Sequence, residues 1–134
     1  MKELQSFQLD FAQCGTELDE FRQLLDARDE LSERKDVLPF FKKRRHLSAL
    51  MGLLAADLIT PNRLAYEFSI FGDFTCDVAI GDSRKGSYCL VEFEDGRSDS
   101  VFRKAGRKAT REWSPRFEHG YGQIIDWFWK TRRP

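Results

Sequence analysis

Three carboxylates near the middle of the chain, Asp77, Glu92 and Glu94, fall in runs that are otherwise largely apolar. In an extended segment over residues 87–94, Glu92 and Glu94 share one face and lie roughly 7 Å apart. Antiparallel pairing with the preceding apolar run can bring Asp77 beside Glu92. Partly desolvated carboxylates that face one another repel, and a bound cation or a shared proton relieves that repulsion. Three carboxylates from two strands are typical of a site for a hard divalent ion such as Mg²⁺.

A simpler alternative is that acids in such segments sit at strand ends and are hydrated. We expect this of Asp73, Asp82 and Asp95, because each is next to a glycine that favours a turn. Asp77 and Glu92 instead lie inside apolar runs, where desolvation perturbs carboxylates and functional sites are more common. The sequence therefore favours a functional role for these two residues.

The elements that must position these acids begin with two helices. Leucine and phenylalanine recur at helical spacing over residues 16–35, and Thr16 can cap the first turn. Pro39 suits the first turn of a second helix, whose apolar stripe continues to Leu58. Four consecutive basic residues, 42–45, lie near the start of this helix and oppose its dipole. They indicate either another use for these charges or an ordinary solvated face.

Beyond the second helix the hydrophobic period changes to two. Strands are predicted over residues 64–71, 74–80 and 87–94, joined by a tight turn at 72–73 and a loop at 81–86. Such short links make an antiparallel meander. Helices followed by strands and a last helix predict an α/β chain of the α+β type.

The segment 97–113 is rich in basic residues and has no clear period. On a helix its basic residues would form one face suited to DNA phosphates, and the alternative is a face that pairs with the acidic N-terminal helix. Ser114 and Pro115 then suit the N-cap and first position of the last helix. The candidate DNA-binding residues are Arg103, Lys104, Arg107, Lys108 and Arg111.

Composition narrows the class of protein. The 134 residues make one ordinary domain, in which 22 basic residues balance 22 acidic ones. Acidic residues outnumber basic ones by 5 in residues 1–36 and again in 67–99, whereas basic residues outnumber acidic ones by 4 in 37–66 and by 6 in 100–134. The three cysteines form no CxxC pair, and the chain has neither an apolar leader nor a bilayer-length apolar stretch. We therefore expect a cytoplasmic protein without membrane contact.

The spacing of Asp77, Glu92 and Glu94 resembles the Asp…(Asp/Glu)-x-Lys signature of the PD-(D/E)XK nuclease superfamily. The closer similarity is to the nuclease domain of the Shedu family, a bacterial anti-phage defence family, and it spans roughly residues 37–130. Besides Asp77, it rests on the segments 38–41, 46–50, 67–68, 91–94 and 122–127, the last reading Gly-Gln-Ile-Ile-Asp-Trp.

This resemblance implies a restriction-endonuclease-like core, with a central mixed sheet that contains an antiparallel three-strand meander and is flanked by helices. Residues 37–134 would form the nuclease domain, and residues 1–36 would be an N-terminal helical extension.

The resemblance also implies a metal-dependent site in which Asp77 and Glu92 bind Mg²⁺ or Mn²⁺. Glu94 takes the position of the usual Lys and could act as a general base or as another metal ligand. Gln123, on the last helix, would orient water or phosphate. Glu67, on the first strand, is a further candidate acid, and an ion-paired or solvated strand carboxylate is the equally simple alternative.

The function implied by the resemblance is hydrolysis of DNA phosphodiester bonds in the bacterial cytoplasm. The alternative is a catalytically inactive nuclease-like domain that binds nucleic acid or assembles with itself. The superfamily core usually continues past the late helix into another strand, but residues 130–134 show no strand pattern. Because an unpaired sheet edge is usually covered, we expect a homo-oligomer.

Overall fold

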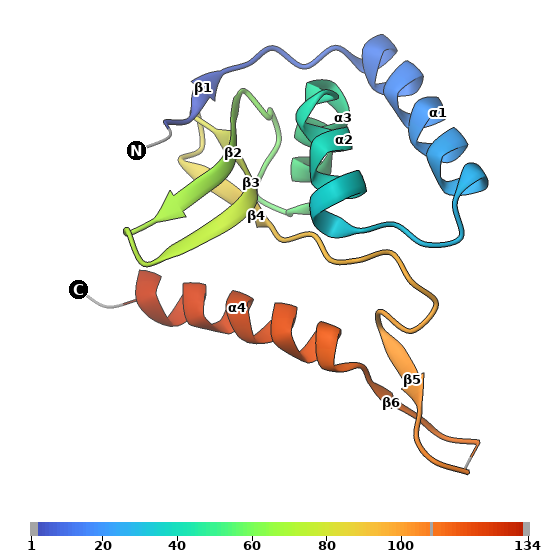
Figure 1. Ribbon diagram of the computed structural model, residues 1–134. Coiled ribbons are helices and arrows are strands. Elements are labelled where there is room, and N and C mark those ends of the chain that lie inside the picture. Colours follow the sequence, from blue (N-terminus) through green and yellow to red (C-terminus); the bar gives the residue numbers. More distant parts are fainter. Residues whose placement is uncertain (1–2, 108, 133–134) are drawn as a thin grey trace.

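The chain folds into two helical layers with a sheet between them, in a computed structural model that describes residues 3–107 and 109–132 (Figure 1). Helices α2 and α3 lie between the sheet and α1, and α4 runs along the other side of the sheet. The helices are α1 (Phe11–Ala27), α2 (Leu38–Lys42), α3 (Arg45–Leu50) and α4 (Pro115–Thr131), with a π-helix η1 (Glu33–Val37) and a 3₁₀ helix η2 (Met51–Leu54). The strands are β1 (Gln5–Ser6), β2 (Arg63–Ile70), β3 (Phe74–Asp82), β4 (Ser87–Val91), β5 (Phe102–Lys104) and β6 (Arg111–Trp113).

The main sheet has the order β1-β2-β3-β4, and β5 and β6 form a separate hairpin. The predicted α+β class and the β2–β3–β4 meander are confirmed. Every described pairing of the main sheet is antiparallel, so the expectation of a mixed sheet is wrong in that detail. The β2–β3 turn is centred on Phe71 and Gly72, one residue earlier than predicted, because both residues adopt positive φ angles, as in the hairpin turns that match strand twist.

The core fills both faces of this sheet. Val78 and Ile80 of β3 pack with Leu58 and Leu64 on the side of η2. On the other side, Trp127 of α4 is 4% exposed and packs against the sheet. The aromatic cluster around Phe40 and Phe41 joins α1 to α2.

The helical region differs from the sequence prediction in three ways. The first helix ends at Ala27 rather than near residue 35, and a separate π-helix follows at Glu33–Val37. Asp10, rather than Thr16, caps α1, because its carboxylate accepts the backbone N–H groups of Ala12 and Gln13 and starts the helix earlier. Where the sequence predicted one second helix, the structure has two short ones, α2 and α3. There the carbonyl of Phe41 accepts the hydroxyls of Ser48 and Tyr66.

The segment after β4 also differs. β4 ends at Val91, so Glu92 and Glu94 lie beyond the strand that was predicted to carry them. The basic segment is the β5–β6 hairpin, not a helix, and it projects away from the rest of the molecule (Figure 1). Stacking of Phe102 on Trp113 across the hairpin favours strands over a helix here. Lys108 lies outside the described residues.

The last helix begins where the sequence predicted. Ser114 is the N-cap and accepts the N–H of Phe117 at 3.1 Å, and Pro115 follows in the first turn. Among the described helices, none combines the length and the apolar character that crossing a membrane requires.

Candidate active site

The two carboxylates that the sequence singled out meet at the end of the meander. The β3–β4 register ends at Val78 opposite Val91, and one further step along each strand reaches Asp77 and Glu92. Asp77 is 9% exposed, and its Oδ2 accepts the backbone N–H of Phe93 at 2.7 Å. The ring of Phe93 stacks on Phe41 of α2, which fixes the segment after β4 against the core. The predicted approach of Asp77 to Glu92 is confirmed.

Glu92 is the most strongly perturbed carboxyl of this site. Burial, followed by the charge of Asp77, raises its pKa to about 7. Hydrogen bonds from the Gln123 side chain and from the Asp77 backbone oppose this rise. Its Oε2 is buried and has no hydrogen-bond partner among the described residues. Within the described chain, one oxygen of this carboxyl group is thus buried without a partner, which is the kind of polar atom that a bound cation would satisfy.

Asp77 shares this environment. Burial is the largest cause that raises its pKa, and the charge of Glu67 adds to the rise. The Phe93 N–H and the charges of Lys42 and Arg34 act in the opposite direction. Asp77 is therefore a desolvated acid with cations nearby.

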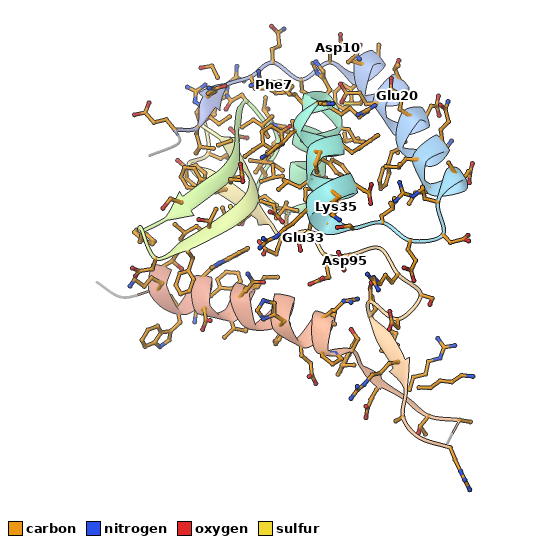
Figure 2. The ribbon with its side chains drawn as sticks, in the orientation of Figure 1. Phe7, Asp10, Glu20, Glu33, Lys35 and Asp95 are labelled. Atoms are coloured by element: carbon orange, nitrogen blue, oxygen red, sulfur yellow. The ribbon has the colours of Figure 1, made fainter. Side chains whose placement is uncertain are left out.

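Glu94 and Glu33 extend the acidic cluster. Glu94 Oε1 accepts the N–H of Asp95, and Glu33 donates its own N–H to Asp95 Oδ1 at 2.8 Å. Burial raises the pKa of Glu33, followed by the charges of Asp77 and Glu94. Glu33 and Asp95 lie near each other in the space between α2 and α4 (Figure 2). The sequence placed Glu33 in the N-terminal extension, and only the tertiary packing of η1 reveals it as part of the site.

Glu67 is ion-paired, and its side chain remains 40% exposed. Its Oε2 accepts Lys42 Nζ at 2.6 Å, and Lys42 is the last residue of α2. The backbone of Glu67 has φ +49°, in the left-handed region that is uncommon for residues with a side chain. The β2–β3 register skips Glu67 and Asp77 while pairing their neighbours on both sides. The only sequence signal for Lys42 was its place in a basic run that opposes the helix dipole.

The donor set suits a divalent ion only in part. Within residues 3–107 and 109–132, no three His, Cys, Asp or Glu side chains are arranged to hold a metal. The expected convergence of Asp77, Glu92 and Glu94 is therefore not present as a ready-made three-carboxylate set. Two carboxylates are still enough, because Mg²⁺ commonly keeps several waters and binds one or two carboxylates together with substrate phosphates. The unpartnered oxygen of Glu92 fits that arrangement.

A cavity connects the acids to the base of the hairpin. Glu92 and Glu94 line a space of about 210 Å³ together with Arg116, Phe117 and Tyr121. The ring of Phe117 stacks on Trp113 of β6, at a centroid distance of 4.3 Å. A row of aromatic rings thus leads from this cavity into the β5–β6 hairpin.

The described basic residues of the hairpin lie on its exposed surface. Arg103 is paired with Glu112 across the hairpin at 2.7 Å, so its charge is partly neutralised. Lys104, Arg107 and Arg111 are also exposed. Helix α1 and the hairpin lie at opposite ends of the molecule (Figure 1), so the described basic residues of the hairpin do not pair with α1. Of the described basic residues in this segment, only Arg97, before the hairpin, approaches an acid of the predicted N-terminal helix, Glu30, at 3.9 Å.

Comparison with known proteins gives one result. A family model described as Shedu protein SduA, C-terminal, matches residues 30–133 and so includes Glu33 as well as the predicted site. No curated protein and no solved structure gives a significant match.

Proposed function

The chain belongs to the Shedu SduA C-terminal family, which places it in the context of anti-phage defence, and we propose that it is a metal-dependent deoxyribonuclease. The observation that carries this proposal is the Asp77–Glu92 pair, in which a carboxyl with a pKa of about 7 keeps one buried oxygen without a partner. Perturbed acids in such a setting are typical of functional sites.

In this proposal Asp77 and Glu92 hold Mg²⁺ or Mn²⁺. A bound ion lowers the pKa of a coordinated water and neutralises charge on the reacting phosphate. Gln123 reaches the Glu92 carboxyl and orients it, or a water beside it, from α4. Glu94, which lines the same cavity, would accept a proton from the attacking water.

The hairpin is the proposed contact for the DNA backbone. Changing Lys104, Arg107 and Arg111 together to Gln should weaken DNA binding and reduce the steepness of its salt dependence, because each phosphate contact contributes about one unit to the slope of log K against log salt. Fluorescence anisotropy with a labelled duplex at several salt concentrations measures both effects. Arg22→Gln on the exposed face of α1 is the control. An unchanged slope in the triple variant would place the DNA contact elsewhere.

A second candidate function is a nuclease-like domain without activity that serves assembly. Two observations favour it: the described residues hold no three-ligand metal set, and apolar side chains are exposed near the β4 edge and on α4. Tyr88, Ile125 and Phe128 are 61%, 47% and 59% exposed. A homo-oligomer that buries them is compatible with either function.

The test that separates the two functions is cleavage of circular and linear DNA with Mg²⁺ or Mn²⁺, compared with EDTA. Isothermal titration with Mn²⁺ and light scattering accompany it. Metal binding with metal-dependent cleavage is the expected result. Oligomers that neither bind Mn²⁺ nor cleave DNA would overturn the nuclease proposal in favour of assembly.

A further inference from the structure

The candidate site is crowded with negative charge, although its proposed substrate is an anion. The charges of Asp77 and Glu33 act on Glu92, and those of Asp77, Glu94 and Asp95 act on Glu33. A phosphodiester that enters this cluster is repelled unless fixed positive charge meets it, since charge in a desolvated site is screened little. A cationic side chain near the acids is therefore needed to bind the phosphate.

Three observations make Lys42 suitable to supply this positive charge. It lies near enough to Asp77 for its charge to act on that carboxyl, it is held at 2.6 Å by Glu67, and its side chain is 37% exposed. Lys42 and Glu67 also line an open groove of about 440 Å³, so the ammonium group is accessible from solvent. Arg45 lines the same groove and adds a second cation to its wall.

The backbone at Glu67 indicates that this pair is more than a surface ion pair. A left-handed conformation at a residue other than glycine costs free energy, and such outliers cluster at functional sites. An exposed ion pair does not offset such a cost, because exposed pairs contribute little to stability. The strained residue and Asp77 are also the two positions that the β2–β3 register leaves unpaired, between Tyr66–Val78 and Phe68–Cys76.

We propose that Lys42 binds the scissile phosphate at the acidic site, and that Glu67 is the positioning residue that holds its ammonium group there. This inference rests on the proposed nuclease function. Lys42 keeps its proton and forms no covalent bond. Water supplies the oxygen that bonds to phosphorus and passes its proton to Glu94. The bond from phosphorus to the leaving oxygen breaks, and solvent water protonates that oxygen. The ammonium stabilises the charge that develops on the phosphate. Fixed cations contribute to phosphoryl transfer in this way.

The test compares Lys42→Met with the matched control Lys43→Met, its neighbour at the end of α2, which faces a different groove. We expect Lys42→Met to reduce kcat by about 100-fold with a smaller change in KM, and Lys43→Met to change neither. Glu67→Gln should lower kcat by about 10-fold without lowering Tm, and Lys42→Arg should retain part of the activity. If Glu67→Gln lowers Tm and leaves kcat unchanged, the pair is only structural and the inference is wrong.

DNA binding provides a readout that does not depend on turnover. In an Asp77→Asn background with Mg²⁺ present, adding Lys42→Met should weaken binding of a short duplex several-fold, whereas adding Lys43→Met should not. If the wild type cleaves DNA but Lys42→Met alters neither kcat nor this affinity, the inference fails and the nuclease function stands. If the wild type does not cleave DNA, the nuclease function fails. A loss of affinity in the binding assay would then show only a DNA-backbone contact at Lys42, and the inference about the scissile phosphate fails together with the nuclease function.

Discussion

Replacing Asp77 by Asn is expected to reduce metal-dependent cleavage by at least about 100-fold while leaving the fold at least as stable as the wild type. Activity falls because the amide is a poor ligand for a hard cation. Stability is kept because the amide oxygen can still accept the Phe93 N–H. Burial raises the pKa of Asp77, so its ionised form opposes folding at neutral pH, and a neutral isostere removes that cost.

Cleavage rates with saturating Mn²⁺ and urea unfolding without metal measure the two effects separately. Asp57→Asn, at an exposed position away from the cluster, is the control and should change neither. A variant that loses activity and stability together would show that Asp77 supports the fold. Unchanged cleavage would remove Asp77 from the proposed metal site.

The metal-free protein should become less stable as the pH rises from about 4.5 to about 7. Glu92 has a pKa of about 7 in the folded protein, against 4.5 for an ordinary Glu, so the folded state holds this proton more tightly than the unfolded chain. The stabilisation is complete below about pH 4.5 and is lost as the pH passes through 7. For this half-buried group the loss is on the order of 2–3 kcal/mol. Asp77 and Glu33, whose pKa values are also raised, add in the same direction.

Urea unfolding at a series of pH values measures this dependence. Glu92→Gln should flatten the curve and raise the free energy of unfolding at pH 8, whereas Glu118→Gln, on the exposed first turn of α4, should leave the slope unchanged. Saturating Mn²⁺ should also flatten the curve, because the ion favours the ionised carboxylate, and Mn²⁺ affinity should rise up to about pH 7. A curve that rises with pH would contradict a raised pKa at Glu92.

The strands were predictable from sequence because alternation over 64–71 and 74–80 leaves few alternatives. The broken second helix was not, because its break depends on hydroxyls of Ser48 and Tyr66 that reach the Phe41 carbonyl through the fold. The β5–β6 hairpin was missed because three-residue strands are too short to show a period, and closely spaced basic residues suit a helix face equally well.

The Asp77–Glu92 pair was predictable because it requires only strand register and two acids in apolar runs. Gln123 followed from the family resemblance, and the structure brings it to Glu92. Glu33 and Lys42 could not be found this way. Each looks like one charge among many on a helical segment, and each comes near Asp77 only through the tertiary packing of η1 and α2.

The buried Glu17 connects α1 to the helices that pack beside the candidate site. Its carboxylate accepts the N–H of Leu47 in α3 at 2.6 Å, so a departure of α1 leaves that amide without its partner. Phe21 of α1 also packs on Phe40 and Phe41 in α2, the helix that ends at Lys42. Local opening of α1 therefore also loosens α2, and the two helices should exchange their amide hydrogens as one cooperative unit. Helix α1 therefore helps to fix the position of the helix that ends at Lys42, and a partner that displaces residues 11–27 should also shift that lysine.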